Sequence, residues 1–97
     1  MSVRDNILAS LRALKPELSS KYNVQSLGLF GSVTREDFKD DSSDIDIIVE
    51  FSRHVGVEFI DLGNYLEAIF KRKVDLVSRK GIKNQYFEEI QNDILYV

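Results

Sequence analysis

Apolar positions along this chain recur with two different periods, which distinguish helices from strands. Spacings of three and four residues indicate an amphipathic helix, whereas alternation or a short apolar run between turn residues indicates a strand. The two patterns follow one another as α-β-α-β-α-β-α-β. After a helical N-terminus, strands are predicted over Val24–Phe30, Asp44–Phe51, Lys73–Ser78 and Ile94–Val97, and the later helices over Val57–Lys71 and Ile82–Asn92.

The N-terminal helix is predicted to be interrupted. Ser2 and Asp5 are typical of a capped helix start, and an apolar stripe follows at Ile7, Leu8, Leu11 and Leu14. Proline lacks an N–H group and suits the first position of a helix, so Pro16 is expected to end this helix or to start another. That second helix would run from Pro16 to about Lys21.

These elements predict a small α/β (α+β) fold, in which a mixed β-sheet is backed by helices too short and irregular for a large doubly wound sheet. The 97 residues are expected to form one domain, residues 1–97. The sequence is 43% hydrophobic and 30% charged, which is typical of a soluble globular protein. No apolar run is long enough for a membrane span, the N-terminus is no signal peptide and cysteine is absent, so we expect a cytoplasmic protein.

Two aspartates interrupt the apolar run of the second predicted strand. Asp44 and Asp46 are i and i+2, so in a strand they project from one face with Cα atoms roughly 7 Å apart. Aspartate is disfavoured inside strands, and like charges this close repel unless a cation lies between them. The pair therefore predicts a divalent metal site, although residues 42–44 could simply form a turn before a strand.

The net charge of −3 conceals an acidic segment. Between Glu36 and Glu50 seven acids stand against Lys39 alone, a local charge of −6, while the rest of the chain carries +3. Basic residues gather at 71–73 and 79–80. The pattern indicates either solvated loops or an acidic metal pocket beside cations that could meet phosphate. A broad basic surface is not evident, so we expect no membrane and no direct nucleic-acid binding.

Gly31 and Ser32 follow the first predicted strand and indicate a turn into a short helix. Glycine permits close backbone approach, and serine can cap the helix, whose free N–H groups attract anions. The segment is not a Walker loop, because the G-x-x-x-x-G-K-[ST] pattern is absent. Taken alone, Gly-Ser is most often only a turn.

Two further residues have a possible chemical role. Alternation places Asp75 on the face of its strand opposite Val74 and Leu76. Asp75 would join Asp44 and Asp46 if the second and third strands are neighbours; otherwise it is an edge residue facing water. His54, the single histidine, lies in a predicted loop and is expected to be exposed, without a catalytic or metal-binding role.

Together, Gly31-Ser32, a loop, Asp44-Ile-Asp46 and Asp75 in a later strand resemble the nucleotidyltransferase superfamily of DNA polymerase beta. The chain is most similar to the minimal nucleotidyltransferases, small antitoxin partners of HEPN-domain toxins in prokaryotes. The similarity covers nearly the whole chain, including its short length and the Tyr96-Val97 ending. Eleven residues separate Ser32 from Asp44, one more than in the commonest form, which a loop absorbs easily.

The resemblance implies Mg²⁺-dependent transfer of a nucleoside monophosphate from a triphosphate such as ATP, with pyrophosphate leaving. By resemblance, Asp44 and Asp46 hold two Mg²⁺ ions, and Asp75 holds the ion nearest the acceptor and helps to deprotonate its hydroxyl. Gly31 and Ser32 would meet the triphosphate. Arg35 is either a further phosphate contact or a solvated side chain, and Ser43 is expected to orient the loop.

The resemblance also implies a partner. The expected function is transfer of AMP to a tyrosine of a cognate HEPN ribonuclease toxin, in a hetero-oligomer, which neutralises the toxin. The motif begins near residue 30 and little of the chain remains for a deep acceptor pocket, which favours a folded protein as acceptor. Two alternatives remain: transfer to a small molecule, as in aminoglycoside nucleotidyltransferases, and an antitoxin that acts by binding alone.

Overall fold

The computed structural model describes residues 3–34 and 44–97. Its elements follow the predicted order of helices and strands. They are α1 (Val3–Tyr22), β1 (Val24–Phe30), the 3₁₀ helix η1 (Gly31–Thr34), β2 (Ile45–Phe51), α2 (Val57–Phe70), β3 (Val74–Ser78), α3 (Asn84–Ile90), the 3₁₀ helix η2 (Gln91–Asp93) and β4 (Leu95–Tyr96).

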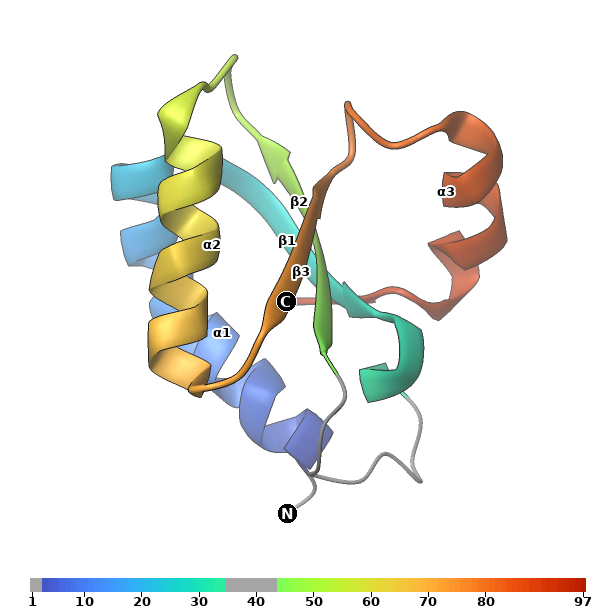
Figure 1. The fold of residues 1–97 in the computed structure, drawn as a ribbon, viewed down its shortest axis with the longest axis horizontal. Helices are drawn as coiled ribbons and strands as arrows, with labels where there is room; N and C mark the ends of the chain where they lie inside the picture. Colours follow the sequence, from blue (N-terminus) through green and yellow to red (C-terminus); the bar gives the residue numbers. More distant parts are fainter. Residues whose placement is uncertain (1–2, 35–43) are drawn as a thin grey trace.

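The strands form one mixed sheet in the order β3-β2-β1-β4. Strand β1 runs antiparallel to both β2 and β4, whereas β2 and β3 are parallel. Parallel neighbours need a crossover connection, which α2 supplies. Figure 1 shows α1 and α2 on one side of the sheet and α3 on the other. The predicted fold class, a small mixed sheet backed by helices, is confirmed.

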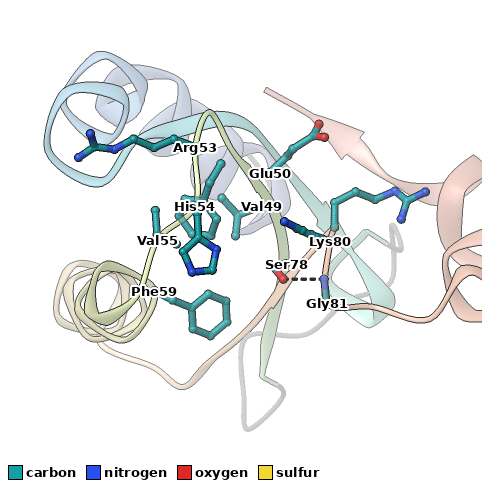
Figure 2. A pocket seen from close by; sticks show the side chains of 11 residues that line it. Val49, Glu50, Arg53, His54, Val55, Phe59, Ser78, Lys80 and Gly81 are labelled. Carbon is teal, nitrogen blue, oxygen red and sulfur yellow. Dashed lines mark hydrogen bonds between the residues drawn. The ribbon is translucent and has the colours of Figure 1, made fainter.

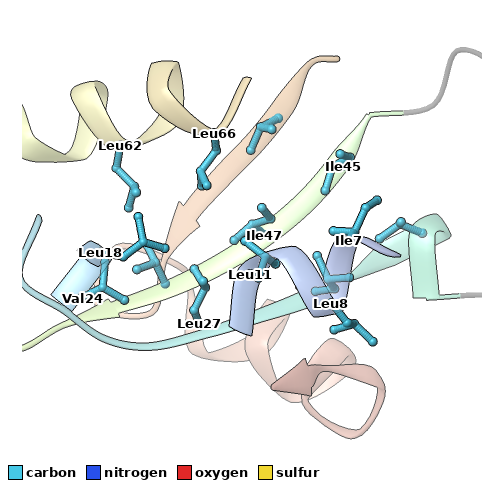
Figure 3. Packing of buried hydrophobic residues seen from close by; sticks show 14 residues of the cluster. Ile7, Leu8, Leu11, Leu18, Val24, Leu27, Ile45, Ile47, Leu62 and Leu66 are labelled. Carbon is cyan, nitrogen blue, oxygen red and sulfur yellow. The ribbon is translucent and has the colours of Figure 1, made fainter. Parts of the chain in front are cut away.

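Alternation along the strands divides the apolar side chains between two clusters. The larger lies beneath α1 and α2, where Leu11, Leu18, Leu62 and Leu66 are fully buried against Ile47 and its neighbours (Figure 3). The smaller contains Phe30, Ile48 and Ile94, with partly buried residues of the α3 region packed against them. Since Asp46 precedes Ile47 and Asp75 precedes Leu76, both aspartates belong to the face that α3 covers.

The prediction that Pro16 divides the N-terminal helix is wrong. Helix α1 runs without interruption from Val3 to Tyr22, with Pro16 exposed inside it. A proline within a helix costs about 3 kcal/mol, because it removes one hydrogen bond and crowds the preceding turn. Leu11 and Leu18 lie on either side of Pro16 and are both fully buried, so tertiary packing offsets that cost. The predicted cap residue Ser2 lies outside the described residues.

Several element boundaries differ from the prediction by one or two residues, and hydrogen bonds account for two of them. Strand β2 begins at Ile45, whose N–H donates to the carbonyl of Lys73, so Asp44 lies just before the strand. The last helix begins at Asn84 rather than Ile82, because the N–H of Ile82 donates to the Ser78 carbonyl and closes a turn after β3. None of the helices in residues 3–34 and 44–97 has the length and apolar character to cross a membrane.

The position of Pro16 predicts a stabilising substitution. Pro16→Ala should restore an N–H donor to α1 and raise the free energy of unfolding by about 1–3 kcal/mol, after allowance for the more flexible unfolded chain. Urea denaturation followed by circular dichroism measures the change. Leu18→Ala, at a fully buried position of the same helix, should instead lower the free energy by about 2–5 kcal/mol. If the urea concentration at the midpoint of unfolding is the same for Pro16→Ala and the parent protein, Pro16 does not destabilise α1.

Candidate active site

The parallel register of β2 and β3 pairs Asp46 with Asp75. Neighbouring strands lie about 4.8 Å apart, so paired residues project side by side from the same face. On the opposite side of β2, Asp46 is the partner of Phe30, the last residue of β1. The condition for including Asp75, that the second and third strands are neighbours, is therefore confirmed. Asp46 is partly buried between its two neighbours, while Asp75 is exposed.

Asp44 lies two residues before Asp46, on the same side of the chain. Its carboxylate is 3.9 Å from the ammonium of Lys73, which itself lies two residues before Asp75. The Lys73 side chain is 74% exposed and that of Asp44 41% exposed, so solvent screens this ion pair and it contributes little to stability. It does place a cation at the edge of the acidic cluster. The position of Lys73 beside Asp44 was not predicted from the sequence, although alternation of residues 73 and 75 along one strand is a signal for it.

The Gly31 turn approaches the aspartates closely. Gly31 has φ +75°, a conformation that side chains strain, and a Cβ atom there would overlap the carboxylate of Asp46. It begins η1, whose geometry is held by Thr34, since the Thr34 hydroxyl donates to the Gly31 carbonyl over 2.7 Å. Ser32 follows within this turn and is half-buried. The predicted turn into a short helix is confirmed, and it brings backbone against a carboxylate.

The electrostatics of the cluster are unfavourable for a charged Asp46. Burial and the charges of Asp75 and Asp44, with a hydrogen bond to Asp75, raise the pKa of Asp46 from 3.8 to about 6. Folding thus brings a carboxylate beside two others, and Lys73 lies against only one of them. An added cation would relieve this repulsion.

The residues fit a divalent cation by chemistry, because hard carboxylate oxygens are the ligands that Mg²⁺ prefers. The arrangement is more open than a preformed metal centre. In the described part of the chain, no three histidine, cysteine, aspartate or glutamate side chains form a group that could hold a metal ion. Asp46 and Asp75 are adjacent, while Asp44 interacts with Lys73. Any metal would therefore depend on Asp44 exchanging this contact for the ion.

Three further residues were considered from the sequence, Arg35, Ser43 and His54. Arg35 and Ser43 fall outside the described residues. His54 is exposed, as predicted, and lies at the other end of the sheet, in the loop between β2 and α2. Five of the predicted site residues thus lie around one end of strands β2 and β3: Gly31, Ser32, Asp44, Asp46 and Asp75.

Comparison with known proteins identifies the class. The model of the nucleotidyltransferase domain family matches residues 11–96, and the chain belongs to this family. The protein adenylyltransferase MntA of Thermococcus cleftensis is 36% identical over 98 residues, which cover 100% of this chain and 98% of that protein. A candidate protein adenylyltransferase of Methanocaldococcus jannaschii is 41% identical over 101 residues, covering all of both chains.

Solved structures narrow the resemblance to the minimal members. A candidate minimal nucleotidyltransferase superimposes with a TM-score of 0.78 at 25% identity, over 95% of this chain and 93% of that one. The fold also matches, with a TM-score of 0.61 and 21% identity, a structure that contains a tri-AMPylated Shewanella oneidensis HEPN toxin and its MNT antitoxin; 96% of this chain and 66% of that one are covered. The resemblance inferred from Gly31-Ser32, Asp44, Asp46 and Asp75 is confirmed.

The contact between Gly31 and Asp46 predicts coupling between two substitutions. Gly31→Ala should destabilise the protein for two reasons, the positive φ and the overlap with the Asp46 carboxylate. In an Asp46→Ala background the overlap disappears and only the backbone strain remains. The destabilisation by Gly31→Ala should therefore be smaller there, by at least about 0.5 kcal/mol in a double-mutant cycle. Equal destabilisation in both backgrounds would show that the turn and the carboxylate do not meet.

The raised pKa of Asp46 predicts a pH-dependent effect on stability. The folded protein binds this proton more tightly than the unfolded chain, so the charged carboxylate destabilises the fold at neutral pH, and that penalty disappears as pH falls from about 6 towards 3.8. Without metal, Asp46→Asn should raise the melting temperature at neutral pH. At a half-exposed carboxyl the gain should be on the order of 1 kcal/mol after solvent screening.

Thermal melts of both proteins in EDTA, at neutral pH and near pH 4, measure the difference. The advantage of the Asn variant should shrink at the lower pH. Glu88→Gln, a charge removal on the exposed surface of α3, serves as control and should show no such trend. A pH-independent gain for Asp46→Asn would rule out proton binding as its cause.

Proposed function

We propose that this protein is an Mg²⁺-dependent adenylyltransferase that transfers AMP from ATP to a tyrosine of a cognate HEPN toxin and so neutralises the toxin. The observation that carries the proposal is the register that sets Asp46 beside Asp75, with the Gly31 turn against the same carboxylate. The site therefore combines a cluster of carboxylates with a close backbone approach, which are the two requirements for handling a metal-bound triphosphate.

Gly31 and Ser32 contact the triphosphate. Absence of a side chain at residue 31 lets the backbone of the turn lie against the Asp46 carboxylate, so a triphosphate bound there would meet both, and the Ser32 hydroxyl is a hydrogen-bond donor in the same turn. Arg35 would add a cation on the phosphates. Lys73 is a further candidate, because its ammonium already lies at the cluster and would be released once Asp44 engages a metal.

Asp44, Asp46 and Asp75 would hold the metal, with two ions expected from the resemblance to the superfamily. When bound, the metal would supply positive charge that offsets the charge of the triphosphate and makes its α-phosphate more electrophilic. Asp75, exposed at the edge of the sheet, is accessible to an incoming acceptor and takes the proton from its hydroxyl. The acceptor oxygen forms a bond to the α-phosphorus, the bond from that phosphorus to the bridging oxygen breaks, and pyrophosphate leaves.

A folded protein is the acceptor that the structure favours. Within the described residues, a groove of about 810 Å³ lies at the end of the sheet away from the aspartates, lined by residues between 49 and 59 and by residues 78–81. A protein acceptor would bring its own binding surface to the aspartates. The names of the relatives support a protein acceptor, and the structural neighbours that contain a HEPN toxin support this partner in a hetero-oligomer. We place the reaction in the cytoplasm and assign it to one domain of 97 residues.

Mass spectrometry tests the proposal. The protein, the HEPN protein encoded beside it, ATP and Mg²⁺ should yield AMP-sized mass additions on the HEPN protein, and fragmentation should place them on tyrosine. Asp46→Asn should reduce the rate at least about a hundredfold, as expected for the loss of a metal ligand. Asp61→Asn, an exposed aspartate of α2 away from the cluster, is the matched control and should retain full activity.

Other outcomes separate the alternatives. If the parent protein and the Asp46→Asn variant silence the toxin equally well, and the mass of the toxin does not change, the protein neutralises its partner by binding alone. That result would replace the proposal. Transfer in EDTA at the rate seen with Mg²⁺ would contradict the metal assignment. Both readouts use variants whose fold is checked by circular dichroism.

A further inference from the structure

A groove lies at the end of the sheet opposite the aspartates (Figure 2). We call it the distal groove. One wall is His54, in the loop between β2 and α2, with Phe59 of the first turn of α2; the other is Ser78 at the end of β3 with the turn that follows it, residues 79–81. From Asp46 to the end of β2 at Phe51 the strand spans roughly 17 Å. The volume of about 810 Å³ is within the range of small-molecule sites.

The turn on one wall is held rigidly by hydrogen bonds. The N–H of Gly81 donates to Ser78 Oγ over 2.9 Å, and the N–H of Arg79 donates to the Val49 carbonyl over 2.8 Å, which ties the turn to β2. A Cβ atom on Gly81 would lie 2.8 Å from Ser78 Oγ, so a larger residue here would displace the Ser78 hydroxyl from this hydrogen bond. Because Ser78 Oγ accepts a hydrogen bond here, its own hydroxyl hydrogen is available to donate to a ligand.

The other wall is aromatic. His54 and Phe59 both line the groove, and Figure 2 shows their rings on the same side of it. The edge of Phe51 packs against Phe59, with ring centroids 6.2 Å apart, which fixes the position of the Phe59 ring. A flat, fixed aromatic surface is suited to stacking a heteroaromatic ring.

The charges at the groove favour an anion on the turn side. Lys80 extends its side chain from the turn and is exposed, while the guanidinium of Arg79 stacks 3.7 Å above the ring of Phe87 and adds positive charge nearby. Glu50 also lines the groove and accepts a hydrogen bond from Ser26, but three cations, Arg53, Arg79 and Lys80, line it as well, so the lining is positive in sum. Glu58 accepts the N–H of Gly56 and so lies with the opposite loop.

We propose that the distal groove is a second binding site, which takes a nucleoside monophosphate with its base on the His54–Phe59 wall and its phosphate at Lys80 and Ser78. An aromatic surface facing a cation and a free hydroxyl is the combination that such a ligand requires. The site is separate from the aspartates and does not depend on the proposed transfer reaction. Its occupant would contact the far ends of β2 and β3, the strands that carry Asp46 and Asp75.

The experiment uses His54 as its reporter, since the chain contains one histidine and its imidazole signals are unambiguous by NMR. AMP is titrated into the Asp44→Asn/Asp46→Asn double variant in EDTA, so that binding at the aspartates does not contribute. AMP should shift the His54 signals saturably. Lys80→Gln should weaken binding about tenfold, the loss of one charge-assisted hydrogen bond.

Controls separate a specific site from general attraction of anions. Lys83→Gln removes an exposed lysine three residues further on, outside the groove, and should leave AMP binding unchanged. Adenosine and inorganic phosphate should each bind more weakly than AMP, because each meets only one wall.

Three results would overturn the proposal. The first is a lack of any His54 shift with AMP at millimolar concentration in protein whose remaining spectrum shows a folded chain. The second is equal weakening by Lys80→Gln and Lys83→Gln. The third is inorganic phosphate binding as tightly as AMP, which would show that the aromatic wall plays no part.

Discussion

Parallel pairing of β2 with β3 places Asp46 directly beside Asp75, and side chains along a strand alternate between faces. A shift of one residue in this pairing would turn Asp75 into the apolar cluster and Val74 and Leu76 out to solvent. The packing of Val74 and Leu76 with α1 and α2 therefore secures the register, and the register secures the site. The hydrophobic effect positions the carboxylates, although none of the carboxylates in the described part of the chain is buried in the core.

Much of this arrangement follows from the sequence. The bounds of β1 are as predicted. The aspartates stand out because they conflict with the apolar pattern around them, and Gly31 stands out because it follows a strand and permits close backbone approach. Pro16 was misjudged because local propensity was weighed without knowledge of the packing of Leu11 and Leu18, which depends on the rest of the fold. The pairing of Asp46 with Asp75 could only be stated as a condition, since strand order is a property of distant parts of the chain.

Contacts between residues of two different connections could not be predicted from the sequence, for a similar reason. One such contact joins Lys73 to Asp44, which are 29 residues apart in the sequence, and another brings Lys80 and His54, 26 residues apart, to one groove. Each depends on where β3 begins or ends next to β2. Charge counting recognised the basic residues at both places, but it could not assign them to opposite ends of one sheet. The two groups of basic residues are distinguished by their position, since one lies at the start of β3 and the other at its end.

Strand β3 forms one edge of the sheet in the described part of the chain, and its outer backbone groups have no neighbouring strand. Such an edge is a template for pairing with another copy, which charged side chains oppose. Lys73 and Asp75 are the exposed charged residues at this edge. Asp75 therefore protects the protein from edge-to-edge aggregation as well as lying in the candidate site. A relative that lost the carboxylate at this position would have to protect the same edge by other means to remain soluble.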